Sequence, residues 1–188
     1  KIAPPFHFVG LSYGGGVGLA YAFRYPKETH NLILMAPYTQ PLEAQDSAIK
    51  KQIAMTRLMF PANPATDDQL YDYFLRQIVY STYPMVEPVV LENPFKLEAT
   101  FRLVQGIRVF RPQNHAGRLR VGVHMMMAGK DQYIPASILE DFWAHTPRNS
   151  RWSRIVIQGS EHKIPEAVPK YAASWIAEIL KANPLLFQ

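Results

Sequence analysis

The chain has 188 residues, 48% of them hydrophobic, and a formal net charge of +5 at pH 7. A globular protein with a sizeable core is expected, and no apolar run reaches the ~18 residues that a membrane span requires. The absence of cysteine excludes disulfides, thiolate metal sites and a cysteine nucleophile.

The first part of the chain predicts two strands joined by a helix. Residues 2–11 form an apolar run of strand length, and residues 31–35 form a second one. Residues 14–25 between them are rich in glycine and alanine, as in a helix that packs closely on a sheet, and Pro26 ends this helix. A strand, a helix and a strand at this spacing predict a βαβ unit and hence a parallel sheet.

The middle of the chain changes to a helical pattern. Residues 42–60 predict one helix, and Thr66-Asp67-Asp68-Gln69 is a capping box that begins a second, ending near residue 80. Asn93-Pro94 begins a third helix that continues to about Arg111, because proline is favoured at the first helical position. We predict that this segment is a helical insertion that covers an edge of the sheet.

The sheet pattern then resumes and continues almost to the end of the chain. The predicted strands are residues 121–128 and 154–157, and the predicted helices are residues 135–144 and 168–182. The expected organisation is therefore a core split by a cap: core residues 1–41, helical cap residues 42–117, core residues 118–182 and a tail of residues 183–188. The predicted fold class is α/β, with a mostly parallel, doubly wound sheet and an inserted helical cap.

Ser12 is the predicted nucleophile. It lies in Gly10-Leu-Ser-Tyr-Gly14, where an apolar strand turns into a helix, and such a turn exposes the serine hydroxyl. Both flanking glycines are expected to lie too close to the backbone and the following helix to carry a Cβ. The backbone N–H of Tyr13, at the helix start, is expected to face the developing oxyanion. The alternative is a glycine-rich loop that only closes the helix onto the sheet.

Two further polar residues follow predicted strands. Asp131 comes after the strand of residues 121–128, and His162 comes after the strand of residues 154–157. In an open α/β sheet the chemistry gathers at the carboxyl ends of the strands, so we expect both residues to lie near Ser12. His162 would take and return the serine proton, and Asp131 would fix the imidazole tautomer. The alternatives are a turn-capping aspartate and a solvated histidine.

These motifs together resemble the α/β-hydrolase family. The quoted motifs are Gly-Leu-Ser-Tyr-Gly-Gly, Ala-Gly-Lys-Asp-Gln-Tyr-Ile-Pro and Gly-Ser-Glu-His, with a proline-punctuated helical cap between the first and the second. The resemblance implies Ser12 as nucleophile, Asp131 as acid, His162 as base and the Tyr13 amide as one oxyanion donor. A serine nucleophile excludes the family's aspartate-nucleophile branch, the haloalkane dehalogenases and epoxide hydrolases. What remains is acyl chemistry, most often ester hydrolysis.

The resemblance covers only the second part of the family's domain. The family has further strands before the nucleophile, and a loop in that part usually supplies the second oxyanion donor, whereas here only residues 1–6 precede the motif strand. We therefore expect the amino-terminal strands to be absent from this chain and to be supplied by the remaining part of the same hydrolase, in the same chain or as a separate fragment. Without them the strand before Ser12 would present an apolar edge.

The expected substrate is a small acyl compound. Met59, Phe60 and Phe74 are candidate walls of an acyl pocket beneath the cap, although most of the apolar residues around them are expected to form the cap's own core. No pair of histidines or carboxylates has the spacing of metal ligands, so no metal and no cofactor are expected. Neither a nucleic-acid motif nor a glycine-rich phosphate loop occurs, so no nucleic-acid partner is expected.

The predicted function is therefore that of a serine hydrolase that cleaves a carboxylic ester or a related acyl bond. A peptidase or a thioesterase with the same three residues is an alternative that the sequence does not separate. A binding module of the same fold, without turnover, is the alternative from another class.

Overall fold

The structure is a computed structural model that describes residues 4–41, 43–86, 99, 102, 106 and 109–185. The chain divides into two compact units, and each is described by itself. The first contains Lys1–Gln40 and Arg111–Gln188, and the second contains Pro41–Phe110.

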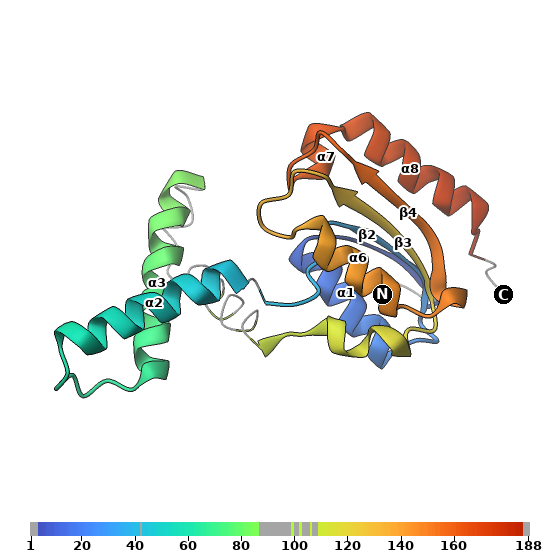
Figure 1. The fold of residues 1–188 in the computed structure, drawn as a ribbon. Helices are drawn as coiled ribbons and strands as arrows, with labels where there is room; N and C mark the ends of the chain where they lie inside the picture. The colour runs from blue at the N-terminus through green and yellow to red at the C-terminus, as the bar shows by residue number, and fades with distance from the viewer. Residues whose placement is uncertain are drawn as a thin grey trace. The chain divides into compact units, whose positions relative to one another are not determined.

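The first unit is built on a four-stranded parallel sheet. The strands lie in the order β1-β2-β3-β4, so neighbours in the sequence are also neighbours in the sheet (Figure 1). Their bounds are β1 Phe6–Leu11, β2 Thr29–Met35, β3 Gly122–Ala128 and β4 Arg151–Ile157. β1 and β4 are the edges of this sheet, and Val9 of β1 is exposed. Because all four strands are parallel, their carboxyl ends lie along one edge of the unit, where the polar residues that follow them can meet.

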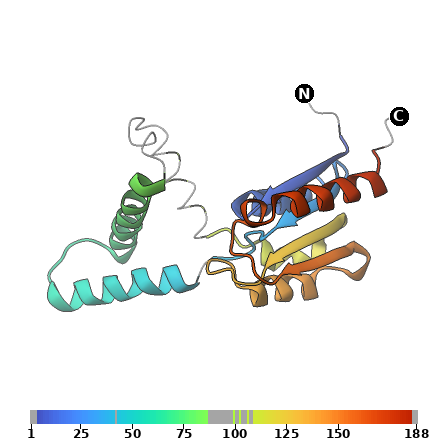
Figure 2. The same cartoon turned by 90° about the horizontal axis from the view of Figure 1, so that it is seen from above.

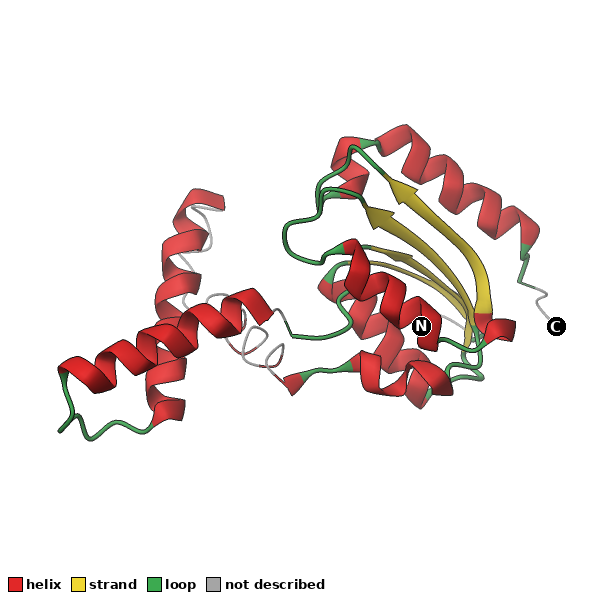
Figure 3. Ribbon diagram, in the orientation of Figure 1, coloured by secondary structure: helices red, strands yellow, loops and turns green. Residues whose placement is uncertain are grey.

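Helices cover both faces of the sheet. α1 (Tyr13–Arg24) and α6 (Ala136–His145) lie on one face, and α7 (Ile164–Ala167) with α8 (Pro169–Ala182) lies on the other (Figures 1 and 3). α8 runs beside the sheet in the turned view as well (Figure 2). The sheet is doubly wound, as the sequence predicts.

Close backbone approach holds α1 against the sheet. A Cβ on Gly18 would lie 2.6 Å from the ring of Phe8, so the missing side chain lets helix and strand touch. On the opposite face Trp175 and Ile179 of α8 join Ile33 and Met126 of the sheet in one buried cluster. The alternate residues of the two central strands, β2 and β3, thus lie in two cores, as expected for strands buried on both faces.

Several boundaries differ from those expected. β1 begins at Phe6 rather than near residue 2, and β4 begins at Arg151, three residues before the apolar run that was used to predict it. The polar start of β4 pairs with β3 through a register irregularity, and a ladder made of backbone bonds does not require apolar side chains. The 3₁₀ helix η1 (Pro112–Arg118) and the single-turn helix α7 were not predicted, because both are too short to show the 3.6-residue period of an amphipathic α-helix.

The second unit contains a pair of helices, α2 (Glu43–Met59) and α3 (Asp67–Val86). The predicted capping box is confirmed: the Gln69 N–H donates to Thr66 Oγ1 and the Thr66 N–H donates to Gln69 Oε1. The Arg57 guanidinium binds the carbonyls of Asn63 and Ala65 and the carboxylate of Asp67, which holds the connection between the helices. Most of the third predicted helix, residues 93–111, lies outside the described residues.

Part of the expected cap core is exposed within this unit. The core contains Ile49, Ile53, Leu70, Tyr71 and Leu75, with Phe74 packed against it. Met55, Leu58, Met59 and Phe60, at the end of α2, are instead each more than half exposed. Among the helices that the structure describes, none combines the length and the hydropathy that a membrane crossing requires.

A buried histidine lies in the face of the sheet that α8 covers. His124 of β3 is 6% exposed, and its Nδ1 lies 2.7 Å from Ser153 Oγ on β4. Burial is the main cause, and the nearby His7 a lesser one, of a pKa lowered from 6.5 to about 4. His124 is therefore neutral in the folded protein at pH 7 and resists protonation down to about pH 4.

We expect this histidine to make the protein less stable in acid. The unfolded chain binds a proton at His124 near pH 6.5, whereas the folded chain does so only near pH 4, so stability falls as the pH decreases through this window. The loss between about pH 7.5 and 4.5 amounts to about 2.5 kcal/mol. Urea unfolding of His124→Gln, compared with the wild type at both pH values, should show a smaller acid-induced loss by this amount. Equal losses in the two proteins would contradict the expectation.

Candidate active site

Ser12 lies in a strained turn between β1 and α1. β1 ends at Leu11, α1 begins at Tyr13, and Ser12 between them has φ 52° and ψ −122°, in the region that L residues rarely adopt. Two backbone hydrogen bonds hold the turn: the Ser12 N–H donates to the Met35 carbonyl at 3.0 Å, and the Tyr38 N–H donates to the Ser12 carbonyl at 2.8 Å. Strained serines of this kind present the hydroxyl at the top of a sheet.

The glycines that are needed for close backbone approach around Ser12 are not the two that the motif predicts. A Cβ on Gly10 would lie 2.7 Å from the Gly14 carbonyl oxygen and from Gly15 Cα, as expected. A Cβ on Gly14 would meet nothing within 4 Å, so the expectation that Gly14 is needed for close approach is wrong. The second close approach occurs at Gly15, where a Cβ would lie 2.7 Å from Pro37 Cβ. The unusual dihedrals fall on Ser12 itself and on neither flanking glycine.

The three polar residues predicted from the strand ends come together. His162 Nε2 lies 2.8 Å from Ser12 Oγ, and His162 Nδ1 lies 2.8 Å from Asp131 Oδ2. The histidine therefore bridges the hydroxyl and the carboxylate, although 150 residues of sequence separate it from Ser12. The alternatives of a solvated His162 and a turn-capping Asp131 without further contacts do not describe this geometry.

Asp131 is anchored as well as paired. Its side chain is fully buried, and its Oδ1 accepts the N–H groups of Tyr133 at 2.9 Å and Ile134 at 2.8 Å. Burial by itself raises the pKa of Asp131, but the hydrogen bonds from His162, Ile134 and Tyr133 outweigh it and hold the pKa below its ordinary value. Asp131 is therefore an ionised carboxylate at neutral pH.

The ionised carboxylate sets the imidazole tautomer. A carboxylate can only accept hydrogen bonds, so His162 Nδ1 donates to Asp131 and Nε2 is left to accept the hydroxyl proton of Ser12. The His162 side chain is 16% exposed, which leaves the imidazole accessible from one side. This arrangement can withdraw a proton from Ser12 and stabilise the imidazolium that forms.

Backbone bonds tie the aspartate loop to the histidine loop. After β3 the Gly129 N–H donates to the Ile157 carbonyl at 2.9 Å, and the Lys130 N–H donates to the Ser160 carbonyl at 2.9 Å. A Cβ on Gly129 would lie 2.7 Å from Gln158 Cα, so the two loops touch through their backbones. Backbone contacts between the two loops, and not side-chain packing alone, thus hold Asp131 and His162 at this distance.

Sequence reasoning missed the residues that support the site. The Tyr133 and Ile134 amides anchor Asp131, and the Tyr133 ring contacts the His162 ring edge to face, with the centroids 5.3 Å apart. The signal available was their position two and three residues after Asp131, where an aspartate commonly accepts backbone N–H groups.

The remaining predicted site residues have separate positions. Tyr13 is the first residue of α1, beside Ser12. Met59, Phe60 and Phe74 belong to the second unit, where the first two are exposed and Phe74 packs against the unit's core. A role of these three residues in an acyl pocket stays a prediction.

Comparisons with known proteins agree with this architecture. The model of a family described as serine aminopeptidase, S33, matches residues 1–166. An esterase from Thermogutta terrifontis has 18% identity and a TM-score of 0.62, and the match covers 97% of this chain and 66% of that one. An α/β-hydrolase enzyme from a Medee basin deep-sea metagenome library has 14% identity and a TM-score of 0.64, with 96% and 66% covered.

A third structure, the enol-lactonase from Burkholderia xenovorans, has 15% identity and a TM-score of 0.58, with 92% of this chain and 65% of that one covered. The chain thus spans about two thirds of the length of these solved structures. A comparison with curated proteins finds no match. The predicted α/β-hydrolase resemblance and fold class are confirmed.

Proposed function

The chain belongs to the serine aminopeptidase S33 family of α/β-hydrolase-fold enzymes, and on this premise we propose that it cleaves a carboxylic ester or a related acyl bond through an acyl-enzyme on Ser12. The observation that supports the proposal most is the line of hydrogen-bond distances from Ser12 Oγ through the His162 imidazole to Asp131, 2.8 Å at each step. A hydroxyl with a base in contact and a carboxylate behind the base is the arrangement that activates a serine.

In the first half of the proposed reaction Ser12 Oγ attacks the acyl carbon while His162 Nε2 takes the hydroxyl proton. The carbonyl oxygen becomes an oxyanion, and the N–H of Tyr13 at the start of α1 is the proposed donor to it, helped by the positive end of the helix dipole. The intermediate then collapses, the bond to the leaving group breaks, and His162 returns the proton to the departing oxygen.

In the second half a water molecule attacks the acyl-enzyme. His162 takes a proton from this water, the new tetrahedral intermediate expels Ser12 Oγ, and the serine regains its proton from His162. The products are a carboxylic acid and a free enzyme. Asp131 keeps the imidazole in the tautomer that can accept, since Nδ1 is engaged by its carboxylate in both halves.

Amide or thioester hydrolysis by the same residues is a second candidate. The family's description, which names an aminopeptidase, favours the amide, whereas the names of two structural neighbours, an esterase and an enol-lactonase, favour oxygen esters. Matched ester, thioester and anilide substrates with one acyl group would separate these chemistries by their kcat/KM values.

A fluorophosphonate reagent tests the proposal directly. Ser12 Oγ should attack the phosphorus and expel fluoride, because His162 activates this hydroxyl. Trypsin then releases residues 2–24, a peptide in which Ser12 is the only serine, so mass spectrometry can assign the adduct without ambiguity. We expect one adduct on this peptide.

Two controls define the outcome of the labelling. Ser12→Ala should lose the adduct, and urea-unfolded wild-type protein should not react, since the activation depends on the fold. Ser160 serves as an internal control, because its hydroxyl is bound to the Glu161 carbonyl at 2.8 Å and should stay unmodified. Folded, complete wild-type protein without an adduct would overturn the proposal and favour the binding module without turnover.

A further inference from the structure

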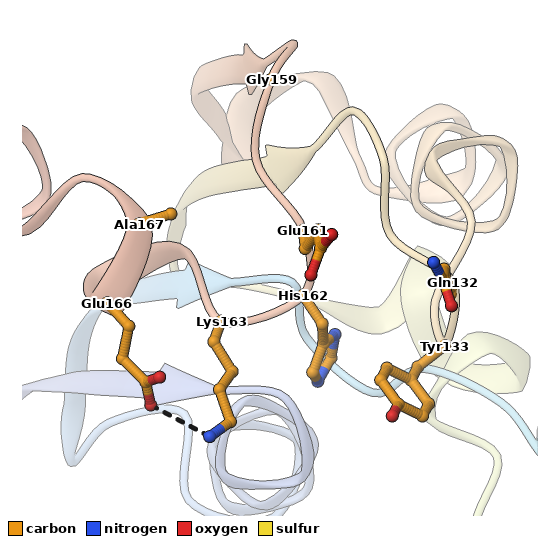
Figure 4. A pocket seen from close by; sticks show the side chains of 8 residues that line it. All are labelled: Gln132, Tyr133, Gly159, Glu161, His162, Lys163, Glu166 and Ala167. Atoms are coloured by element: carbon orange, nitrogen blue, oxygen red, sulfur yellow. Dashed lines mark ion pairs between the residues drawn. The ribbon is translucent and has the colours of Figure 1, made fainter.

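A pocket of about 570 Å³ opens beside the imidazole of His162 (Figure 4). Its lining comes from the two loops that follow β3 and β4 and from the short helix α7, and thus from the first unit. The lining residues are Gln132, Tyr133, Gly159, Glu161, His162, Lys163, Glu166 and Ala167. Figure 4 shows Gln132 and Tyr133 on one side of the imidazole and Lys163 with Glu166 on the other.

The position of this pocket identifies what it would hold, and this step rests on the proposed function. His162 Nε2 takes the proton of Ser12 and must return it to the departing atom of the substrate. The leaving group therefore lies against the imidazole when the bond breaks. Because His162 itself lines the pocket, we assign the pocket to the leaving-group side of the reaction.

The charges of the lining do not cancel. Lys163 Nζ lies 3.2 Å from Glu166 Oε1, so the cation of the pocket is already paired. The carboxylate of Glu161 is exposed and has no ion pair among the described residues. The pocket therefore carries one negative charge without a partner, and this charge attracts a cation and repels an anion.

The aromatic wall of the pocket also favours a cation. Tyr133 is 63% exposed, although its ring contacts the His162 ring with the centroids 5.3 Å apart. The face of an aromatic ring attracts an ammonium group, best when the ring is held in place. Apart from this ring, the apolar residues of the lining are Gly159 and Ala167, and neither has a large side chain.

We propose that this pocket selects substrates whose leaving group carries a positive charge, such as the alcohol part of an ester that bears an ammonium group. Glu161 supplies the charge that the ammonium group meets, and Tyr133 supplies the ring beside it. Glu161 is thus a specificity-determining residue that takes no part in bond breaking.

The test uses two esters of the same shape, one with a cationic leaving group and one with a neutral leaving group. Butyrylcholine and 3,3-dimethylbutyl butyrate share the acyl group and the shape of the leaving group, but the second has carbon in place of the ammonium nitrogen. We expect the wild type to hydrolyse the choline ester with a roughly tenfold higher kcat/KM, from one exposed ionic contact and one cation–π contact. Glu161→Gln should reduce this ratio to about twofold.

Glu178→Gln is the matched control, because Glu178 is an exposed residue of α8 outside the pocket and its replacement changes the net charge equally. The ratio in this variant should stay at the wild-type value. A wild-type ratio near one, or a ratio that Glu161→Gln leaves unchanged, would overturn the proposed selectivity for a cationic leaving group. Hydrolysis of both esters would still support the proposed function.

A binding measurement keeps the two proposals separable. Saturation-transfer NMR on Ser12→Ala protein, which needs no turnover, should detect binding of choline but not of 3,3-dimethylbutan-1-ol at equal concentration. Adding Glu161→Gln should weaken the choline signal severalfold. Absence of choline binding overturns the inference whatever the turnover, whereas absence of both turnover and fluorophosphonate labelling overturns the proposed function.

Discussion

Replacing Asp131 by asparagine is expected to lower kcat about 10⁴-fold with little change in KM. The structure shows which way the new amide would lie. Two backbone N–H groups, those of Tyr133 and Ile134, donate to Oδ1, so the carbonyl oxygen of the asparagine takes that position. The amide NH₂ then takes the place of Oδ2 and presents a donor to His162 Nδ1.

This donor reverses the tautomer of the His162 imidazole. Nδ1 must now accept, so the proton moves to Nε2, which faces Ser12 Oγ at 2.8 Å and can no longer take the serine proton. The fold should survive, because the amide has the shape of the carboxylate and keeps both backbone bonds. Initial rates with a butyrate ester, together with thermal unfolding of the same samples, measure the two effects separately.

Asp141→Asn is the control for this substitution. Asp141 is an exposed residue of α6 whose carboxylate binds Gln113, and it lies outside the Ser12, Asp131 and His162 contacts. We expect this variant to keep the wild-type kcat. An Asp131→Asn enzyme within about tenfold of the wild type would show that the carboxylate does not set the tautomer.

The sequence was most informative about the ends of the strands, because the polar residues that follow parallel strands are brought to the same edge of the sheet. Parallel strands bring their carboxyl ends to one edge, so polar residues in the loops after three apolar runs were expected near one another, whatever the length of chain between them. This is why Ser12, Asp131 and His162 could be named from the sequence, and why their atoms lie within hydrogen-bond distance in the structure.

The features that could not be predicted from the sequence depend on contacts between backbone segments far apart in the chain. The bond from the Lys130 N–H to the Ser160 carbonyl and the close approach of Gly129 to Gln158 leave no mark in the side-chain pattern. The pocket beside His162 was missed for a similar reason, since Glu161, Lys163 and Glu166 read as ordinary surface charges until the loops are placed. The polar start of β4 was missed because apolar side chains were the criterion.

The two glycines of the Ser12 motif are expected to respond in opposite ways to alanine. Gly10→Ala should destabilise the fold by about 3 kcal/mol or more, because its Cβ would lie 2.7 Å from the Gly14 oxygen and from the Gly15 nitrogen and Cα. All three are backbone atoms, so relief requires α1 to move away from β1. Such a movement would also displace Ser12 from His162 and slow labelling by a fluorophosphonate.

Gly14→Ala is the matched control within the same motif. A Cβ at Gly14 meets nothing within 4 Å, and the residue lies in α1 with an ordinary φ. The substitution should therefore be neutral or stabilising by up to about 1 kcal/mol, since alanine loses less backbone freedom in a helix. Urea unfolding of the two variants measures the difference. If Gly14→Ala were the more damaging of the two, close approach at Gly10 would not be what the motif requires.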